Sequence, residues 1–221
     1  MDSAEFITRY PRLYHMAQDG SWPLVQRLGL LSTRALLDSF KVFGEARAAI
    51  LERRRPTSVT IRAAEHGEAV VRDQLPLNDA VLERVLDDGL SPGDWYRMLN
   101  EFVFFWPTEQ RLATLLSARA YRNRSHTVLV IDTEALVRDH GDRVRLSPIN
   151  SGNTLFNARS RGHATFRSIA DYPFDEMRGR RGPAGAVAEV AVLNGVTPIE
   201  PVLISADRRT GADVIANLWT P

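Results

Sequence analysis

The stretch Ala188-Glu189-Val190-Ala191-Val192 places a single carboxylate inside an apolar run. The small and β-branched residues around Glu189 predict a buried strand over residues 187–192. An ionised carboxylate in such a strand is costly unless it is paired or faces a cleft that a ligand can enter. The sequence therefore predicts a cleft beside Glu189, and the plainer alternative is a glutamate at a strand edge that faces water.

Short strands and helices alternate over the rest of the chain, which predicts the α+β class. We expect further strands at residues 12–16, 59–62, 69–72, 102–106, 127–131, 143–146 and 202–205. We expect helices at residues 3–9, 22–29, 79–88, 92–100 and 134–140, two within 33–55, and one that ends near 121. Only Asn194-Gly195 and Pro198 mark turns between the last two strands, which predicts that these strands form a hairpin or a close pair.

No linker divides the chain, so we expect one domain over residues 1–221. Residues 34–100 are expected to form a mainly helical insertion in a β-rich core. Residues 148–183 contain Gly, Asn, Ser and Arg with weak periodicity, which predicts a long mobile loop. Loops of this length often form lids or binding loops.

Composition excludes several kinds of chemistry. The 221 residues include no cysteine, so disulfides, thiolate metal sites and cysteine nucleophiles are excluded. Asp139-His140 and Glu65-His66 lack metal-ligand spacing, and no Gly-x-Ser-x-Gly or Walker-type loop occurs. No apolar run approaches the roughly 18 residues of a membrane helix, and the first residues lack the features of a secretory signal. We therefore expect a cytoplasmic protein.

The charged residues of the sequence do not identify a binding partner. The formal net charge of +1 provides no general argument for nucleic-acid binding. Lys41 is the only lysine, and all other basic residues are arginines, which fits either phosphate recognition or the codon usage of a GC-rich genome. Several arginines fall in the long segment before Glu189, where they would suit a phosphate-bearing acceptor or a solvated loop: Arg159, Arg161, Arg167, Arg178, Arg180 and Arg181.

Four segments, taken in order, resemble the ADP-ribosyltransferase fold. They are Leu13-Tyr14-His15 with Gly29-Leu30-Leu31-Ser32, Val103-Phe104-Phe105-Trp106 with Arg111, Val128 to Leu136, and Ala188 to Val192. Within that fold the chain is most similar to DarT-type enzymes, whose best-known members attach ADP-ribose from NAD to bases of single-stranded DNA. The resemblance covers roughly residues 12–205.

The resemblance implies a split β-sandwich core with a helical insertion, NAD as the substrate and no metal. It implies a nucleic acid, DNA or RNA, as the acceptor, with a protein as the alternative. Single-stranded nucleic acid and a neutralising antitoxin protein are the implied partners. A binding module of the same fold that recognises NAD, ADP-ribose or nucleic acid without turnover is the second hypothesis, and an RNA 2′-phosphotransferase is the third.

The resemblance also implies roles for single residues. His15 would hydrogen-bond a ribose of NAD, the backbone beside it would hold the nicotinamide amide, and Tyr14, Met16 and Ser32 would complete this part of the site. Glu189 would bind the 2′-hydroxyl of the nicotinamide ribose and stabilise the cation formed as nicotinamide leaves. His15 as a core-edge histidine is the plain alternative, and Glu200 and Glu176 replace Glu189 if the register of the match is shifted.

Arg111 would take part in catalysis by binding the diphosphate or the acceptor, although Pro107-Thr108-Glu109-Gln110 departs from the Pro- and Ser-rich turn of those enzymes. An ordinary surface arginine is the alternative. Phe105 and Trp106 are candidates to stack on nicotinamide or adenine, or are plain core residues. The polar turn from Ser147 to Asn153 is a candidate phosphate contact.

Overall fold

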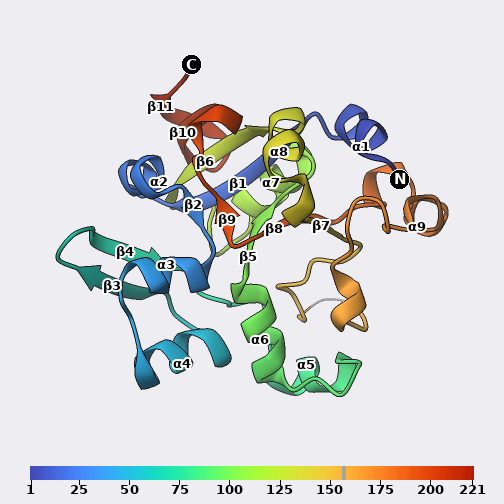
Figure 1. Ribbon diagram of the computed structural model, residues 1–221, viewed down its shortest axis with the longest axis horizontal. Coiled ribbons are helices and arrows are strands. Elements are labelled where there is room, and N and C mark those ends of the chain that lie inside the picture. Colours follow the sequence, from blue (N-terminus) through green and yellow to red (C-terminus); the bar gives the residue numbers. More distant parts are fainter. Residues whose placement is uncertain (156–157) are drawn as a thin grey trace.

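Two antiparallel sheets form the framework of this α+β chain (Figure 1). The computed structural model describes residues 1–155 and 158–221. The larger sheet has the strand order β1 (Arg12–Gln18), β6 (Ser125–Asp132), β10 (Leu203–Thr210) and β11 (Asp213–Trp219). The smaller sheet has the order β5 (Phe102–Phe105), β8 (Glu189–Leu193) and β7 (Val144–Ser147).

One isolated backbone bridge, between Tyr14 and Trp106, joins the edges of the two sheets, and β1 and β5 diverge from it. The N–H of Tyr14 donates to the carbonyl of Trp106 at 3.0 Å, and the N–H of Trp106 donates back at 2.8 Å. In an uninterrupted antiparallel ladder the next such pair would be Met16 and Phe104. Side chains bond both of those carbonyls instead, which opens a gap between β1 and β5.

The main core lies between the sheets, and a second core lies behind β6. Leu129 and Ile131 of β6 face the main core, whereas Val128 and Val130 pack against α7 (Glu109–Leu116). The predicted strand at residues 127–131 is therefore present and is buried on both faces. The other helices around the sheets are α1 (Ser3–Arg9), α2 (Trp22–Leu28), α8 (Thr133–His140) and α9 (Phe174–Arg181). The 3-10 turns are η1 (Gly141–Arg143), η2 (His163–Thr165), η3 (Pro183–Gly185) and η4 (Glu200–Val202).

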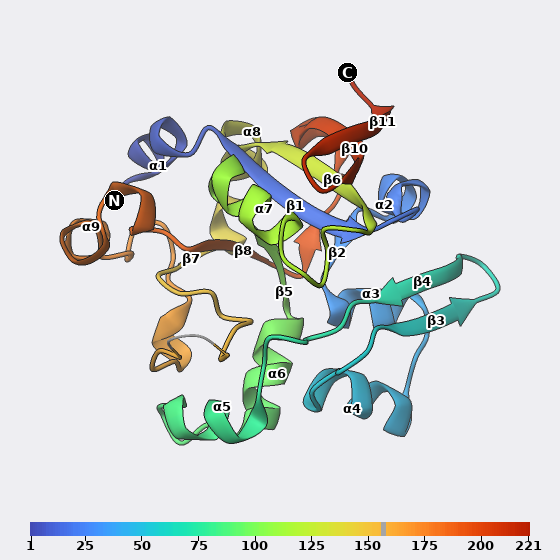
Figure 2. The same ribbon diagram turned by 180° about the vertical axis from the view of Figure 1, so that it is seen from behind.

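Residues 34–100 lie along the lower side of the molecule, below both sheets (Figures 1 and 2). They form helices and one hairpin: α3 (Thr33–Ser39), α4 (Gly44–Glu52), β3 (Val59–Ala63), β4 (Gly67–Val71), α5 (Asp79–Val85) and α6 (Pro92–Asn100). The hairpin packs on α3 and α4 through one hydrophobic cluster, and α5 packs on α6 through another. We call residues 34–100 the inserted segment.

The predicted pairing of the last two strands is wrong. β8 lies between β5 and β7, whereas β10 lies between β6 and β11 in the other sheet. Between them the chain forms β9 (Gly195–Val196), which pairs with β2 (Leu30–Leu31). A Cβ at Gly195 would lie 2.2 Å from the carbonyl oxygen of Leu30, so only glycine permits this approach. At this contact the chain passes from β8 in the smaller sheet to β10 in the larger sheet.

Two further expectations differ from the structure. The helix after β5 ends at Leu116 rather than near residue 121, and the following residues form turns. The described part of segment 148–183 has local order, because it contains η2 and α9 and buries Tyr172, whose hydroxyl donates to the carbonyl of Ala186. None of the helices within residues 1–155 and 158–221 is both long and apolar enough to cross a membrane.

Candidate functional site

A cavity of about 590 Å³ opens where β1 and β5 diverge. One side of it is formed by the sheets and includes His15, Trp106 and Glu189. The opposite side is formed largely by the inserted segment and includes Arg55 and residues 68–74. We call this the central cavity, and we call its two sides the sheet wall and the inserted wall.

His15 is held in one tautomer. Its Nδ1 lies 2.8 Å from the carbonyl oxygen of Phe104. A carbonyl oxygen only accepts, so Nδ1 carries the proton and Nε2 keeps a lone pair. Burial lowers the pKa of His15 to about 4, the bond to Phe104 opposes this shift, and the charge of Arg72 adds to it. His15 is therefore neutral at pH 7 and presents a hydrogen-bond acceptor.

Glu189 is the first residue of β8 and is 5% exposed. Its Oε2 accepts a hydrogen bond of 2.9 Å from the N–H of Ser151. Burial raises the pKa of Glu189 to about 7, while the hydrogen bonds from Ser151 and the charges of Arg161 and Arg111 oppose this rise. Near neutral pH the carboxyl is therefore divided between its protonated and ionised forms, as is typical of acid–base groups in active sites.

The loop that carries Ser151 is held by Arg161. The Arg161 side chain is buried and donates from Nη1 to the carbonyl of Ser151 at 3.0 Å and from Nη2 to that of Asn153 at 3.1 Å. Its Nε donates to the carbonyl of Arg159 at 3.0 Å, and its guanidinium carbon lies 5.8 Å from the ring centre of Trp95. Arg161 therefore acts on Glu189 in two ways: through its charge, and by holding Ser151, the residue whose N–H donates to Glu189.

Four of the eight predicted site residues line the central cavity. These are His15, Met16, Trp106 and Glu189. They come from β1, from β8 and from the residue that follows β5, which are far apart in the chain, and the fold brings them together. Trp106 is half-buried, so part of its indole ring remains free to contact a ligand.

The other four predicted site residues lie outside the cavity lining. Tyr14 is buried in the core behind β6, and Phe105 is buried with its ring centre 5.6 Å from that of His15. Ser32 caps α3, because its hydroxyl accepts from the N–H of Ala35 at 3.2 Å. Arg111 donates to the carbonyl of Ala184 at 3.4 Å and reaches Glu189 only through its charge.

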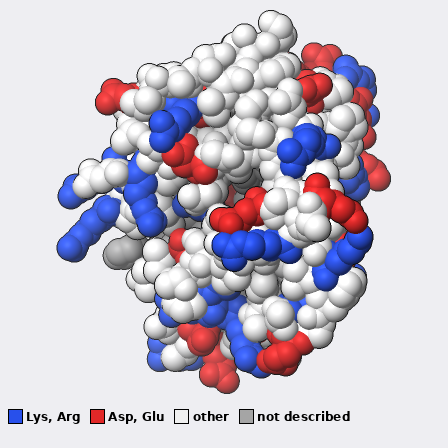
Figure 3. Space-filling model, turned by 90° about the vertical axis from the view of Figure 1, so that its left-hand side faces the viewer, with Lys and Arg blue, Asp and Glu red and all other residues white. Residues whose placement is uncertain are grey.

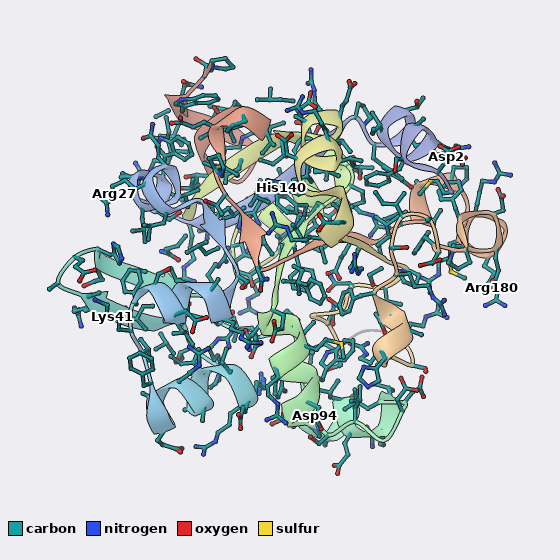
Figure 4. All side chains as sticks on the ribbon, in the orientation of Figure 1. Asp2, Arg27, Lys41, Asp94, His140 and Arg180 are labelled. Atoms are coloured by element: carbon teal, nitrogen blue, oxygen red, sulfur yellow. The ribbon has the colours of Figure 1, made fainter. Side chains whose placement is uncertain are left out.

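The competing glutamates and most of the predicted acceptor arginines are exposed. Glu200 accepts from Gln26, and Glu176 pairs with Arg180 within α9. Arg180 points away from the centre of the molecule (Figure 4). On the face drawn in Figure 3, basic and acidic side chains are interspersed. Neither Glu200 nor Glu176 lines the central cavity.

The charged residues of the inserted wall were not predicted. Arg55 is buried and donates to the carbonyl of Ile50, to that of Arg72 at 3.0 Å and to Oδ1 of Asn100 at 3.1 Å. Arg72 donates from Nη1 to the carbonyl of Met16 at 3.2 Å. Nothing in the local sequence distinguishes these two arginines from exposed ones, so their position depends on the fold.

The acidic and histidine side chains do not form a metal centre in the part of the chain that the structure describes. No group of three or more such side chains in residues 1–155 and 158–221 is arranged to hold a metal ion. The polar groups that line the central cavity include a neutral imidazole, a carboxyl of raised pKa and two arginine guanidinium groups, and also hydroxyl and amide groups and the carboxylates of Asp19, Glu68 and Asp73.

Comparison with known proteins assigns a family without a known activity. A family model described as a family of unknown function (DUF7002) matches residues 11–203. No curated protein matches the chain. The matched range includes both sheet strands that carry His15 and Glu189 and the whole inserted segment. The chain therefore belongs to the DUF7002 family.

Proposed function

We propose that the central cavity binds NAD and that the protein is an ADP-ribosyltransferase with an ADP-ribosyltransferase-like split β-sandwich core. One observation carries the proposal: His15 and Glu189, on strands of different sheets, line the same cavity. The cavity volume of about 590 Å³ lies within the range of roughly 300 to 1,000 Å³ that small-molecule sites occupy. The proposed acceptor is a nucleic acid, with a protein as the alternative.

His15 orients the substrate in this proposal. Its Nε2 accepts a hydrogen bond from a ribose hydroxyl, and because the Phe104 carbonyl fixes the ring, the acceptor is held in place before the ligand arrives. A charged imidazole would offer only donors, so the low pKa of His15 preserves this role over the neutral pH range. Trp106 provides an aromatic face in the same cavity.

Glu189 stabilises the reacting centre in this proposal. The bond between C1′ of the ribose and the nicotinamide nitrogen breaks, and both bonding electrons leave with nicotinamide. The ionised carboxylate binds the 2′-hydroxyl and stabilises the cation that develops on the sugar. An acceptor oxygen or nitrogen then bonds to C1′, and Glu189 removes its proton. Because the pKa of Glu189 is about 7, the rate should rise as the pH increases through 7.

The test compares two variants that differ only in which glutamate is changed. Purified protein is mixed with NAD and either single-stranded DNA, RNA or cell lysate, and released nicotinamide is measured. Glu189→Gln should lower the rate by about 100-fold or more, whereas Glu200→Gln, at an exposed site outside the cavity, should leave it unchanged. Equal release by the native protein and Glu189→Gln would remove Glu189 from the mechanism.

A second candidate function is a binding module that holds NAD or ADP-ribose without turning it over. The position of Arg111 outside the cavity lining favours this alternative, because the resemblance assigns that arginine a part in catalysis. Two measurements together decide between the candidates: calorimetry for NAD binding and the assay for released nicotinamide. Binding of NAD without nicotinamide release under any acceptor condition supports the module, and release that depends on Glu189 supports the enzyme.

A further inference from the structure

Arg72 connects the inserted wall to the sheet wall of the central cavity. It directly follows β4, and its Nη1 donates to the carbonyl of Met16, the residue after His15. Its guanidinium carbon lies 5.1 Å from the ring centre of Tyr121, which is close enough for a cation–π contact. These two contacts fix the guanidinium beside His15, at the point where β1 and β5 diverge.

The charge of Arg72 is not paired directly in the part of the chain that the structure describes. Burial lowers the pKa of Arg72, and the neighbouring Asp73 acts on it only through its charge, which opposes the larger effect of burial. Within residues 1–155 and 158–221 Arg72 forms no ion pair, and the bond to Met16 uses only one of its five N–H groups. Asp73 accepts instead from the hydroxyl of Ser58 and the N–H of Leu75. Partial burial of an unpaired cation is unfavourable, and an anionic ligand would offset that cost.

The groups beside Arg72 narrow the class of ligand. His15 is neutral and offers an acceptor to a hydroxyl, whereas Arg72 offers donors and a positive charge to an anion. A sugar that carries a phosphate satisfies both groups at once, because the hydroxyl and the anion lie a few bonds apart. A guanidinium binds phosphate oxygens through paired N–H groups.

We propose that Arg72 binds the phosphate of a ribose-phosphate ligand. If that ligand is the dinucleotide NAD, the group that Arg72 binds is the diphosphate. The proposal rests on the proposed function for the identity of the dinucleotide. It adds a residue of the inserted segment to the binding site. The inserted segment then contributes directly to ligand recognition as well as enclosing the cavity.

Binding measurements test this inference without reference to turnover. ADP-ribose carries the diphosphate and adenosine does not, so the two are titrated by calorimetry into the native protein, Arg72→Gln and Arg53→Gln. Arg53 is an exposed arginine of the same segment and serves as the matched control. Arg72→Gln should weaken ADP-ribose binding by about 10-fold or more and change adenosine binding by less than about 2-fold. Arg53→Gln should change neither.

Three results with Arg72→Gln would overturn the proposal. Equal ADP-ribose affinity of the native protein and Arg72→Gln removes the phosphate contact, and tighter binding by the variant shows that Arg72 blocks the cavity. Loss of single-stranded oligonucleotide binding with unchanged ADP-ribose binding assigns the phosphate to the acceptor. If Arg72→Gln does not fold, competition on the native protein decides, because pyrophosphate must displace ADP-ribose.

The same measurements separate this inference from the proposed function. Weaker ADP-ribose binding by Arg72→Gln, together with no nicotinamide release by the native protein, keeps the phosphate site and excludes the transferase. Nicotinamide release that depends on Glu189, together with unchanged ADP-ribose binding by Arg72→Gln, keeps the transferase and excludes the phosphate site.

Discussion

Each wall of the central cavity contains a buried charged side chain, and the two side chains differ in how completely they are hydrogen-bonded. On the inserted wall, all three nitrogens of the Arg55 guanidinium group donate to carbonyl or amide oxygens. On the sheet wall, Glu189 is as deeply buried, yet within the described residues its hydrogen bonds come from one residue, Ser151. A charge whose hydrogen bonds are complete within the protein stabilises the fold, whereas a charge with incomplete bonds is available to a ligand.

The pKa values follow the same division. Burial lowers the pKa of Arg55 to about 10, so that arginine stays charged and its bonds persist at neutral pH. Burial raises the pKa of Glu189 to about 7, so its charge changes within the physiological range. The comparison therefore assigns Arg55 to stability and leaves Glu189 available to a ligand, as the proposed function requires. Arg72 lies on the inserted wall, but its hydrogen bonds within the protein are incomplete. By this criterion it is, like Glu189, available to a ligand.

The largest expected effect is the loss of stability when Arg55 is replaced. A small loss would contradict the comparison, because the buried hydrogen bonds of Arg55 would then not stabilise the fold. Arg55→Met keeps much of the side-chain volume but removes every donor to Asn100 and to two carbonyls. We expect the free energy of unfolding, measured by urea denaturation, to fall by about 3 kcal/mol. Arg53→Met, at an exposed position, should change it by less than about 0.5 kcal/mol. A loss below about 1 kcal/mol for Arg55→Met would contradict the structural role.

The second prediction tests whether Glu189 destabilises the fold. Its folded pKa lies above its ordinary value, so the native protein loses stability as the pH rises from about 4.5 through about 7. A glutamine side chain in place of Glu189 does not titrate and can still accept from the Ser151 N–H. Glu189→Gln should therefore match the native protein near pH 4 and be more stable by about 3 kcal/mol at pH 8.

Urea denaturation over this pH range measures that difference, and Glu200→Gln is the control. Glu200 is exposed, so its substitution should add no pH dependence to the free energy of unfolding. A constant difference between Glu189→Gln and the native protein from pH 4 to pH 8 would show that the carboxyl is not buried as described.

The third prediction concerns the acceptor of His15 on the sheet wall. His15→Gln can donate to the Phe104 carbonyl but cannot present a second acceptor in the place of Nε2. If the proposed function is correct, kcat/KM for NAD should fall by about 10-fold. His163→Gln, an exposed histidine, is the matched control. An unchanged kcat/KM for His15→Gln would return His15 to the core-edge role.

The smallest expected effect concerns the outer surface of the inserted segment. Phe43 is 70% exposed, so its substitution removes little buried apolar area. Phe43→Ser should change the free energy of unfolding by less than about 0.5 kcal/mol in urea denaturation. A large loss would mean that the stability of the segment depends on its exposed tip rather than on its buried network.

Single strands were easier to predict than their partners. The alternation and the β-branched residues located β1, β5, β6, β7 and β8 within a few residues of their observed bounds. The pairing of residues 187–192 with 202–205 was wrong, because local patterns record which face is buried and carry no information about which strand lies alongside. Strand β11 was not predicted, although its sequence contains Val214, Ile215, Leu218 and Trp219. Most of its residues are exposed.

The candidate site was predictable only in part. The charge of Glu189 in an apolar run is visible in the sequence. So is His15, with the segment Gly29-Leu30-Leu31-Ser32 further along the chain. Arg53, Arg54 and Arg55 stand side by side in the sequence and cannot be told apart there. In the structure Arg53 is exposed and Arg55 is buried, because α4 ends and turns Arg55 toward Asn100.

The sequence by itself determined the α+β class, the buried strand with one carboxylate, and the absence of thiol chemistry, because these follow from residue type and local periodicity. Only the tertiary structure decided that β8 and β10 belong to different sheets, that His15 and Glu189 share a cavity, and that arginines of the inserted segment complete it. The reason is physical. Burial and hydrogen-bond satisfaction depend on long-range contacts, and these contacts set the pKa of Glu189 and leave Arg72 without an ion pair within the described residues.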